Sequence, residues 1–564
     1  MSWVAFSCWI AMVVGLARMP PCPSIPAASM RQAKERVVSA EKLGMRTAGS
    51  ALSGGGWNLW TFGDLGQWVE IAERHKVGIR VRAAGSSLKG VWPEAELVVV
   101  VAKKGRMHPA FRKIFRVGRS RFEDHRFVVD LEPGVVLVRL RFLNDARDRR
   151  TGEDRNLFVR EIGLTGVAHL ASEPRWWRPL GKHVGLGASM LRAVTNASIA
   201  RIRMGQLRIQ TSPGAQVKVR QLQHAFAFGT AVATRFFGSP STVESRGYLR
   251  LMTDNFNAVV PENAMKWPRS EPVQGREQWE GVDRMLRYCV AKDMQVRGHC
   301  LFWAMPSQVP GWVRRLDRPS LARAVDVRAK RTTARFVGRI EEFDVDNEML
   351  RHSWYRNRLG AKVVARMFEM AAEGNPRARL YVNDHGILTQ GNQAFAYGRQ
   401  IQELLDRKAP LGGIGCQAHF DRPPDPNQVW RVLDYLSEFG LPITITEYDF
   451  GRGDEAEKAR VLTSFFRVCF AHPGVRGIYQ WGFWSGAHWK PERALWGKEG
   501  KASPAAEVYR DLVYHEWWTR FDGKADARGW IRVPAFFGKH RVESGGKSKI
   551  VTLERGQSSV RVSF

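Results

Sequence analysis

Apolar and polar residues alternate with a period of two along residues 50–165, which indicates β-strands. Runs such as GIRVRAAG (78–85), AELVVVVA (95–102) and VVLVRLRF (135–142) are separated by turn residues. Short strands at even spacing over roughly one hundred residues are typical of a β-sandwich. We therefore predict an N-terminal β-sandwich over 50–165. Residues 166–195, which mix Trp, Gly and Pro without a clear period, are predicted to be a linker.

Apolar strands alternate with amphipathic helical runs across residues 196–520. Most strands are followed by a helix candidate such as VVARMFEMAAE (363–373). About 300 residues with eight such units match a (β/α)₈ barrel, so the expected fold class is α/β. The predicted strands cover residues 224–232, 256–263, 295–303, 343–349, 378–385, 412–420, 441–450 and 477–484. Residues 521–564 form short β-like runs, which predict a small β appendage with no chemistry of its own.

The first residues carry an uncharged apolar run, WVAFSCWIAMVVGLA (3–17), followed by Arg18 and a Pro-rich stretch. This run is too short to span a bilayer comfortably and is typical of a signal peptide, which we place within residues 1–28. We therefore expect a secreted protein, extracellular or periplasmic, with no membrane association in its mature form.

The net charge of +32 raises the question of nucleic-acid binding. Lys and Arg are scattered along the chain without a dense run, a zinc-finger spacing or an RNA-binding aromatic signature, so we expect no nucleic-acid partner. An acidic polysaccharide, such as a hemicellulose decorated with uronic acids, suits the charge equally well. The 21 Trp residues agree with a sugar ligand, because indole rings stack on the flat apolar faces of sugars.

Polar residues and Trp cluster at the ends of the predicted barrel strands. In (β/α)₈ barrels the chemistry takes place at the carboxyl ends of the strands, so these side chains are expected to converge. Carboxylates, amides, His and Trp on one face describe a carbohydrate site. The residues at these ends are Glu262, Asn263, Lys266, Trp267, His299, Trp303, Asn347, Glu348, Asn383, Asp384, Gln417, His419, Glu447, Asp449, Trp481 and Trp484.

Two of these carboxylates, Glu348 and Glu447, end strands that are otherwise mostly apolar. Cleavage of a glycosidic bond needs one carboxyl group that donates a proton and another that attacks or stabilises the oxocarbenium-like centre. A lone strand-end Glu is more often a salt-bridge or helix-capping residue. The polar ends of all eight predicted strands favour the catalytic interpretation here.

These residues lie in motifs that resemble glycoside hydrolase family 10, the endo-β-1,4-xylanase family, in its plant-type and bacterial branch. The resemblance covers essentially all of 196–520. It is carried by FNAVVPENAMKW (256–267), RGHCLFW (297–303), DVDNEM (344–349), LYVND (380–384), GIGCQAHF (413–420), ITEYD (445–449) and WGFWSGAHW (481–489). It implies a retaining endo-1,4-β-xylanase that acts on xylan by double displacement and needs no cofactor for catalysis.

Position by position, the resemblance implies that Glu348 is the acid/base and Glu447 the nucleophile. It implies that His419 hydrogen-bonds the nucleophile and that Asn347 holds the 2-hydroxyl of the sugar under attack. The implied sugar-binding residues are Glu262, Asn263, Lys266, His299, Trp303, Gln417, Trp481 and Trp489.

Other readings of the barrel remain open. A β-1,4-glucanase differs only in accepting one more hydroxymethyl group, which is a small discrimination for a pocket. A non-catalytic glycan-binding protein of the same fold is a second alternative, although such a protein has no need for both carboxylates. The chain also departs from the common family pattern at His385 and Tyr448, and these changes bear on sugar preference.

The predicted sandwich resembles the calcium-dependent xylan-binding modules of carbohydrate-binding families 36 and 60. The motifs are KGVWPEAELVV (89–99) and FLNDARDRRTGEDRNLFV (142–159). Asp145 and Asp154 are the matching acidic positions, and their oxygen ligands suit Ca²⁺. Arg160 stands where the resemblance leads us to expect Asp. Acids that only cap loops of a structural sandwich are the alternative.

Overall fold

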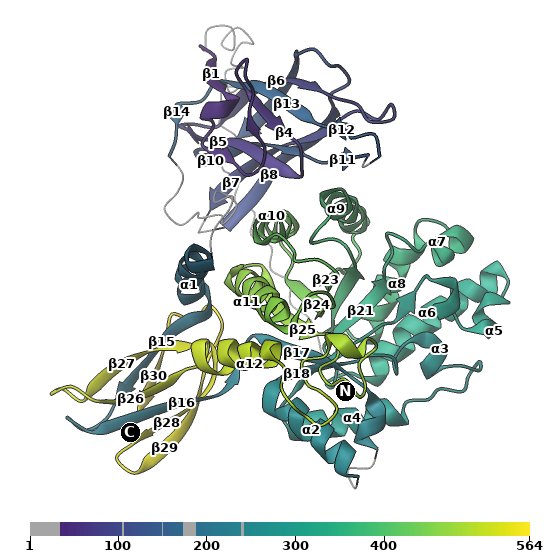
Figure 1. Ribbon diagram of the computed structural model, residues 1–564, viewed down its shortest axis with the longest axis vertical. Coiled ribbons are helices and arrows are strands. Elements are labelled where there is room, and N and C mark those ends of the chain that lie inside the picture. Colours follow the sequence, from purple (N-terminus) through teal and green to yellow (C-terminus); the bar gives the residue numbers. More distant parts are fainter. Residues whose placement is uncertain (1–33, 104–105, 149, 173–187, 239–241) are drawn as a thin grey trace, which may run out of the picture.

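The computed structural model describes residues 34–103, 106–148, 150–172, 188–238 and 242–564. An N-terminal sandwich, a central barrel and a C-terminal β-unit are distinct parts of the molecule, with helix α1 (Ala188–Arg203) between the sandwich and the β-unit (Figure 1). The predicted signal peptide lies outside the described residues. Among the helices that are described, none combines the length and the apolar character needed to cross a bilayer.

Two antiparallel sheets of six strands each form the sandwich. One has the order β3-β4-β13-β6-β9, with β1 beside β13, and the other has the order β14-β5-β10-β7-β8, with β2 beside β5. Alternate residues such as Val77, Ile79 and Val81 of β6 are buried between the sheets. The strands are β1 (Arg36–Ser39), β2 (Met45–Arg46), β3 (Ser50–Ala51), β4 (Trp57–Leu59), β5 (Gly63–Ile71), β6 (His75–Gly85), β7 (Glu94–Lys103), β8 (Arg106–Arg116), β9 (Glu123–Leu131), β10 (Gly134–Phe142), β13 (Leu157–Thr165) and β14 (His169–Leu170), with the small pair β11 (Ala146–Arg147) and β12 (Asp154–Arg155) outside both sheets.

The sandwich is wider than the range 50–165 expected from the sequence, because β1 and β2 precede it and β14 follows it. The range 166–195, expected to be a linker, contains β14 and the first part of α1 (Ala188–Arg203). The residues between these two elements that would test the linker further, 173–187, lie outside the described residues.

A closed parallel barrel occupies the centre of the chain and confirms the predicted α/β fold. β17 pairs with β25 and β19 pairs with β21, so the sheet closes on itself, and the third strand position is shared by the short segments β19 and β20. The strands are β17 (Ala227–Val232), β18 (Ala258–Pro261), β19 (Gln295–Gly298), β20 (Phe302–Trp303), β21 (Glu342–Asn347), β22 (Arg379–Asp384), β23 (Gly413–Phe420), β24 (Ile443–Phe450) and β25 (Val475–Gln480).

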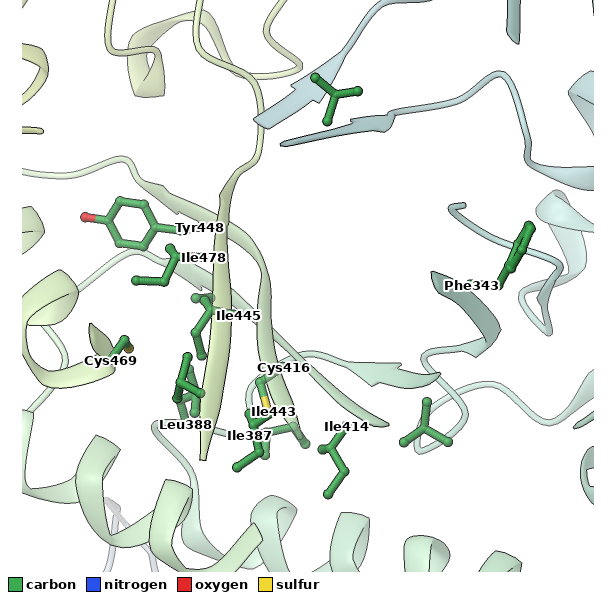
Figure 2. Close-up of a cluster of buried hydrophobic side chains, with 14 of the residues drawn as sticks. Phe343, Ile387, Leu388, Ile414, Cys416, Ile443, Ile445, Tyr448, Cys469 and Ile478 are labelled. Atoms are coloured by element: carbon green, nitrogen blue, oxygen red, sulfur yellow. The ribbon is translucent and has the colours of Figure 1, made fainter. Parts of the chain in front are cut away.

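Helices surround the barrel and cover the outward-facing side chains of its strands. Ile443 and Ile445 of β24 share one buried cluster with Cys469 of α11, part of which Figure 2 shows. Several helices begin at Asp N-caps; Asp425, for example, accepts a hydrogen bond from the backbone of Asn427 at the start of α10. The helices are α2 (Val243–Asn255), α3 (Trp267–Ser270), α4 (Glu280–Ala291), α5 (Gly311–Arg314), α6 (Arg318–Arg335), α7 (Trp354–Leu359), α8 (Val363–Gly374), α9 (Gly391–Asp406), α10 (Pro426–Ser437), α11 (Glu455–Ala471) and α12 (Pro504–Asp511).

The C-terminal β-unit is built from two distant parts of the chain. Strands β15 and β16 precede the barrel, and the other five follow it. One sheet has the order β27-β15-β30 and the other β26-β16-β28-β29. The unit that contains the predicted appendage 521–564 thus also includes β15 and β16, which lie in the range 196–520 predicted for the barrel. The strands are β15 (Met204–Gln210), β16 (Gln216–His224), β26 (Arg520–Lys524), β27 (Trp530–Phe536), β28 (Gly538–Ser544), β29 (Lys547–Leu553) and β30 (Ser559–Ser563).

The sandwich is joined to the barrel through α10. Glu438, just after α10, forms ion pairs with three arginines of the sandwich, Arg112, Arg139 and Arg141. The guanidinium of Arg141 also lies over the ring of Tyr435, 4.6 Å from its centroid. Because these charged groups are nearly all inaccessible to solvent, the interface is a buried ionic cluster flanked by aromatic rings.

Candidate active site

The carboxyl end of β24 presents two consecutive residues to the inside of the barrel. The register between β23 and β24 shifts at this point, so that Cys416 pairs with Ile445 and Gln417 with Glu447, which leaves Thr446 as the extra residue of a bulge. Thr446 donates a hydrogen bond to the side-chain oxygen of Asn383 (2.6 Å), and the amide nitrogen of Asn383 donates to Glu447. The bulge therefore aims both residues at Asn383.

Glu447 is held as a carboxylate acceptor by two donors. Asn383 Nδ2 donates to Glu447 Oε1 at 2.8 Å, and His419 Nε2 lies 3.1 Å from Glu447 Oε2. The Glu447 side chain is nearly buried, with 5% of its surface exposed. Hydrogen bonds of this kind favour the charged form of a carboxylate and fix its direction.

His419 bridges Glu447 and Asp449. Its Nδ1 lies 2.9 Å from Asp449 Oδ2. Burial alone would lower the pKa of His419, but the hydrogen bonds and charges of Asp449 and Glu447 outweigh burial and raise that pKa to about 9. Asp449 in turn accepts hydrogen bonds from Trp489 Nε1 (2.9 Å) and Arg493 Nη1 (2.8 Å). The imidazole is thus protonated at neutral pH, and Asp449 fixes its orientation from the side opposite Glu447.

Glu348 follows β21 and has a left-handed backbone conformation, with φ of 58°. Such a conformation is uncommon for a residue other than glycine and is often found at functional sites. The Glu348 backbone N–H donates to the carbonyl of Asn383 (2.8 Å). Its carboxylate accepts hydrogen bonds from Trp303 Nε1 and Gln417 Nε2, both at 3.2 Å, and His352 Nε2 lies 3.4 Å away.

A chain of amides connects the two carboxylates. Gln417 Nε2, which donates to Glu348, also lies 3.4 Å from Asn347 Oδ1, and Asn383 Nδ2, which donates to Glu447, lies 2.9 Å from the same oxygen. The Asn347 side chain is fully buried, yet its Nδ2 has no hydrogen-bond partner among the described residues. A buried amide that lacks a partner is costly, so this donor is suited to a ligand hydroxyl.

The remaining predicted sugar-binding residues surround this pair. His299 Nδ1 lies 3.0 Å from Asp344 Oδ2, and its ring packs against Trp481 edge to face with centroids 5.1 Å apart. Lys266 Nζ donates to Asn263 Oδ1 (2.9 Å) and lies over the ring of Trp303, 5.0 Å from its centroid.

Glu262 and Trp489 complete the set. Burial raises the pKa of Glu262, against the opposing charge of Lys266. Trp489 is 46% exposed, which leaves much of its ring open to solvent beside His419, with ring centroids 5.2 Å apart.

Contacts link the predicted residues of the barrel site to the group around Glu348 and Glu447. Trp481, and through it His299, joins this group at the ring of His419, 6.3 Å away between centroids. Glu262 enters through the charges of Lys266 and His299. Sequence reasoning placed Asn383 and Asp449 at strand ends without giving them a role. Arg493 lies in the loop after β25 and carries no motif that would have marked it. The sequence could have marked His352 as a neighbour of Glu348, because it follows Glu348 by only four residues.

The predicted calcium residues of the sandwich lie near each other. Burial and then the charge of Asp154 raise the pKa of Asp145 to about 6. Asp154 Oδ1 is buried without a hydrogen-bond partner among the described residues. No group of three or more His, Cys, Asp or Glu side chains gathers as a metal cluster in the described part of the chain, so further ligands would be carbonyl, amide or water oxygens. Arg160 lies over the ring of Phe122, 4.8 Å from its centroid. The two carboxylates therefore fit a hard cation, with fewer acids than the resemblance implies.

A closed barrel with carboxylates, amides and indoles at the carboxyl ends of its strands is the arrangement expected of a glycoside hydrolase. The chain belongs to glycosyl hydrolase family 10, because the model of that family matches residues 219–511. Residues 78–177 match a second family, described as a Ca-dependent carbohydrate-binding module, xylan-binding. Both resemblances drawn from the sequence are confirmed.

The chain is also similar to several individual proteins. The chain is 33% identical over 355 residues to anti-sigma-I factor RsgI6 of Acetivibrio thermocellus, covering 62% of this chain and 46% of that protein. It is 33% identical over 333 residues to endo-1,4-beta-xylanase 1 of Arabidopsis thaliana, covering 58% and 34%. The chain thus spans between a third and a half of the length of these relatives. Xylanase 10B of Thermotoga petrophila, solved in complex with xylobiose, has 26% identity and a TM-score of 0.48 over 52% of this chain and 95% of that chain.

Proposed function

We propose that this protein is a retaining endo-1,4-β-xylanase in which Glu447 is the nucleophile and Glu348 the acid/base. The observation that carries the proposal is the different environment of the two carboxylates. Glu447 accepts hydrogen bonds from Asn383 and from the protonated His419, so an amide and a cationic ring fix the direction of its carboxylate. Glu348 instead accepts hydrogen bonds from the neutral donors Trp303 and Gln417, with the ring of His352 3.4 Å away.

The mechanism follows from these roles. Glu447 attacks the anomeric carbon while Glu348 protonates the leaving oxygen, and the bond between the sugar and the leaving group breaks. Glu348 then takes a proton from water, which displaces Glu447 from the covalent sugar–enzyme intermediate with net retention. For this double displacement the two carboxyl groups are expected to lie about 5–5.5 Å apart.

Neighbouring groups position the sugar. The unpartnered Nδ2 of Asn347 is suited to donate a hydrogen bond to the sugar 2-hydroxyl, next to the attacked carbon. Hydrogen bonds to the 2-hydroxyl strengthen in the transition state and contribute to the rate. Lys266, Asn263 and His299 offer further polar contacts, and Trp481 and Trp489 offer ring faces.

The test compares release of reducing ends from xylan, glucuronoxylan, mixed-linkage glucan and cellulose. We expect release from both xylans by the wild type, a loss of at least 10³-fold in Glu447→Ala, and wild-type rates in a Glu341→Ala control, since Glu341 is exposed and precedes β21 at the opposite end of that strand. The anomeric configuration of fresh product, followed by NMR, reports retention. Preferred cleavage of the glucans would establish the glucanase alternative, and no release from any polymer would leave only glycan binding.

The sandwich is proposed to bind xylan with help from Ca²⁺ held by Asp145 and Asp154. The ion would supply positive charge between two carboxylates and open positions for sugar hydroxyls. Support comes from the raised pKa of Asp145, the unpartnered Oδ1 of Asp154 and the matched family's printed description.

Removal of calcium tests this site. Because the pKa of Asp145 is raised to about 6, the metal-free protein should gain stability as the pH falls through 6, and Asp145→Asn should melt at a higher temperature than the wild type at pH 7.5 in EDTA. Millimolar CaCl₂ should raise the melting temperature of the wild type but not of Asp145→Asn or Asp154→Asn. Asp148→Asn, in the same loop, is the control. An equal response of all four proteins to CaCl₂ contradicts the assignment.

We also propose that the protein is exported, on the basis of the apolar run at residues 3–17. N-terminal sequencing of protein recovered from the culture medium or periplasm tests this, and retention of the full run on cytoplasmic protein would contradict it.

A further inference from the structure

Three arginines form a row across the outer face of the sheet β27-β15-β30 in the C-terminal β-unit. Arg208 of β15 pairs in register with Arg532 of β27 on one side and with Arg561 of β30 on the other. All three are exposed, while their neighbours Leu207 and Ile209 point to the core of the unit. Adjacent strands are about 4.8 Å apart, so three positive charges lie within about 10 Å.

This row has no counter-charge. Arg208, Arg532 and Arg561 form no ion pair with any residue that the structure describes, and the strands that carry them contain no Asp or Glu. The outer face of the other sheet differs, because Lys218 of β16 pairs in register with Asp522 on one side and Glu543 on the other. Like charges directly opposite each other repel and destabilise a sheet. An anionic ligand bound to this row would reduce the repulsion.

An aromatic ring and an amide hold two of the three guanidinium groups in place. Arg561 and Arg208 lie over the ring of Trp530, 5.0 and 5.8 Å from its centroid, and Arg561 donates a hydrogen bond to the side chain of Gln210. The N–H donors of a guanidinium lie in its plane. A guanidinium that lies over a ring therefore still offers these donors, in pairs, to a carboxylate. The row is therefore preorganised for planar anions.

The surroundings of the row favour a sugar carboxylate over a phosphate chain. The positions that flank the arginines on the same face are uncharged, namely Gln206, Gln210, Pro534, Ser559 and Ser563. Amides and hydroxyls of this kind suit neutral sugar hydroxyls on either side of an isolated acid. A nucleic-acid strand carries a charge every 3.4 Å or so and calls for a longer basic track, and the Trp530 ring, occupied by two arginines, is not free to stack on bases.

We propose that this face, formed by Arg208, Arg532 and Arg561 with Trp530, is a binding site for the uronic-acid side groups of acidic xylan. It lies on the C-terminal β-unit, apart from the barrel centre and the N-terminal sandwich (Figure 1). It recruits acidic xylan by its side groups, whereas the barrel site contacts the xylose backbone. The choice of polymer rests on the proposed function.

The test measures binding of the full chain to glucuronoxylan and to the same polymer after reduction of its carboxyl groups. Glu447→Gln serves as the background, so that the polymer stays intact and binding is read without cleavage. We expect Arg208→Gln/Arg532→Gln/Arg561→Gln to bind glucuronoxylan at least fivefold more weakly at 50 mM NaCl, and to bind the reduced polymer as the background protein does. Arg208→Gln alone, at the centre of the row, should show a partial loss.

A triple variant with the same charge change is the matched control. Lys218→Gln/Arg520→Gln/Lys524→Gln removes three exposed cations from the other sheet of the same unit and should leave glucuronoxylan binding unchanged. The arginine variants should melt at the same temperature as the background or higher, because like-charge repulsion is relieved.

Three outcomes would overturn the proposal: equal losses in the two triple variants, an equal loss for the reduced polymer, or tighter binding of the background protein to a 20-nucleotide single-stranded DNA than to glucuronoxylan, lost in the arginine variant. Cleavage of the polymers by the wild type is scored separately. Failure of the proposed xylanase activity is thereby distinguished from failure of this site.

Discussion

At the scale of single residues, the protonation of His419 is tied to folding. Its pKa is raised to about 9 in the folded protein, above an ordinary value near 6.5. A group with a raised pKa contributes stability that is fully present below pH 6.5 and is lost as the pH rises through 9. We expect the free energy of unfolding of the wild type to exceed that of His419→Gln at pH 6 and the difference to shrink steadily towards pH 9.5, as measured by urea titration.

A second histidine provides the control for this pH series. His169 pairs with Glu70 at 3.0 Å, but both side chains are largely exposed. Since exposed ion pairs contribute little, His169→Gln should follow the wild type at every pH. A constant difference between the wild type and His419→Gln across the pH range would show that the ring stabilises by packing alone.

Asn383 is a positioning residue that sequence reasoning left without a role. Its amide donates to both Glu447 and Asn347. A hydrogen bond to a charged group contributes about 1.5–3 kcal/mol, so Asn383→Ala should lower kcat by about 10- to 100-fold. KM should change little, because the lost hydrogen bond orients the attacking Glu447 carboxylate and is not a contact with the sugar.

Asn375 separates this effect from simple destabilisation. It is also buried, and its amide donates to the carbonyl of Ile340 away from the site. Asn375→Ala should lower stability while leaving kcat near the wild-type value. A kcat of Asn383→Ala equal to that of Asn375→Ala would contradict the positioning role.

At the scale of elements, the segment that follows α10 couples the sandwich to the barrel. Glu438, with only 6% of its side chain exposed, pairs with three sandwich arginines, which hold the pKa of its carboxyl far below the ordinary range despite burial. Removing one partner of a buried ionic cluster costs about 3–5 kcal/mol. Glu438→Gln should therefore split a single thermal transition into two at pH 7, as seen by calorimetry.

The direction in which stability changes with pH, and a control variant, test this prediction further. A carboxyl group with a lowered pKa contributes stability above pH 4.5 that is lost as the pH falls, so the wild type should approach Glu438→Gln in acid. Glu373→Gln, which breaks an exposed pair with Lys330, should change stability by less than about 0.5 kcal/mol. One undivided transition in Glu438→Gln at pH 7 would show that the apolar contacts alone join the two domains.

Elements differ in how far the sequence predicts them. The barrel strands follow from runs such as ITITEYDF, since β-branched residues buried on both faces leave a local signal. The site at their ends followed as well, because strand ends in a parallel barrel must converge. The bulge at Thr446 and the anchoring of Asp449 by Arg493 depend on register and on a distant loop, and neither leaves a periodic pattern.

At the scale of the whole molecule, the last residues are part of a core. The inner faces of β15 and β16, with Leu207, Ile209, Val217 and Val219, are covered by strands that follow Thr519. Exposing four such side chains costs on the order of 6–12 kcal/mol at about 1.5–3 kcal/mol each. A chain that ends at Thr519 should be insoluble or should melt at a markedly lower temperature.

A small insertion in the same segment controls for general sensitivity. Gly545 and Gly546 form an exposed turn between β28 and β29 with open space around them, so two residues added there should leave the melting temperature nearly unchanged. A truncated chain that melts like the wild type would mean that the C-terminal unit is a removable appendage.

The position of β15 in the middle of its sheet also has a consequence during translation. Its two partners, β27 and β30, lie more than 300 residues further along the chain, after the entire barrel. At 5–20 residues per second a ribosome needs roughly 15–60 s to reach them. Over that interval the nascent chain carries β15 and β16 with unpaired edges and apolar faces. We therefore expect the yield of this protein to depend more on chaperones that shield such strands on the ribosome than on the folding of its barrel.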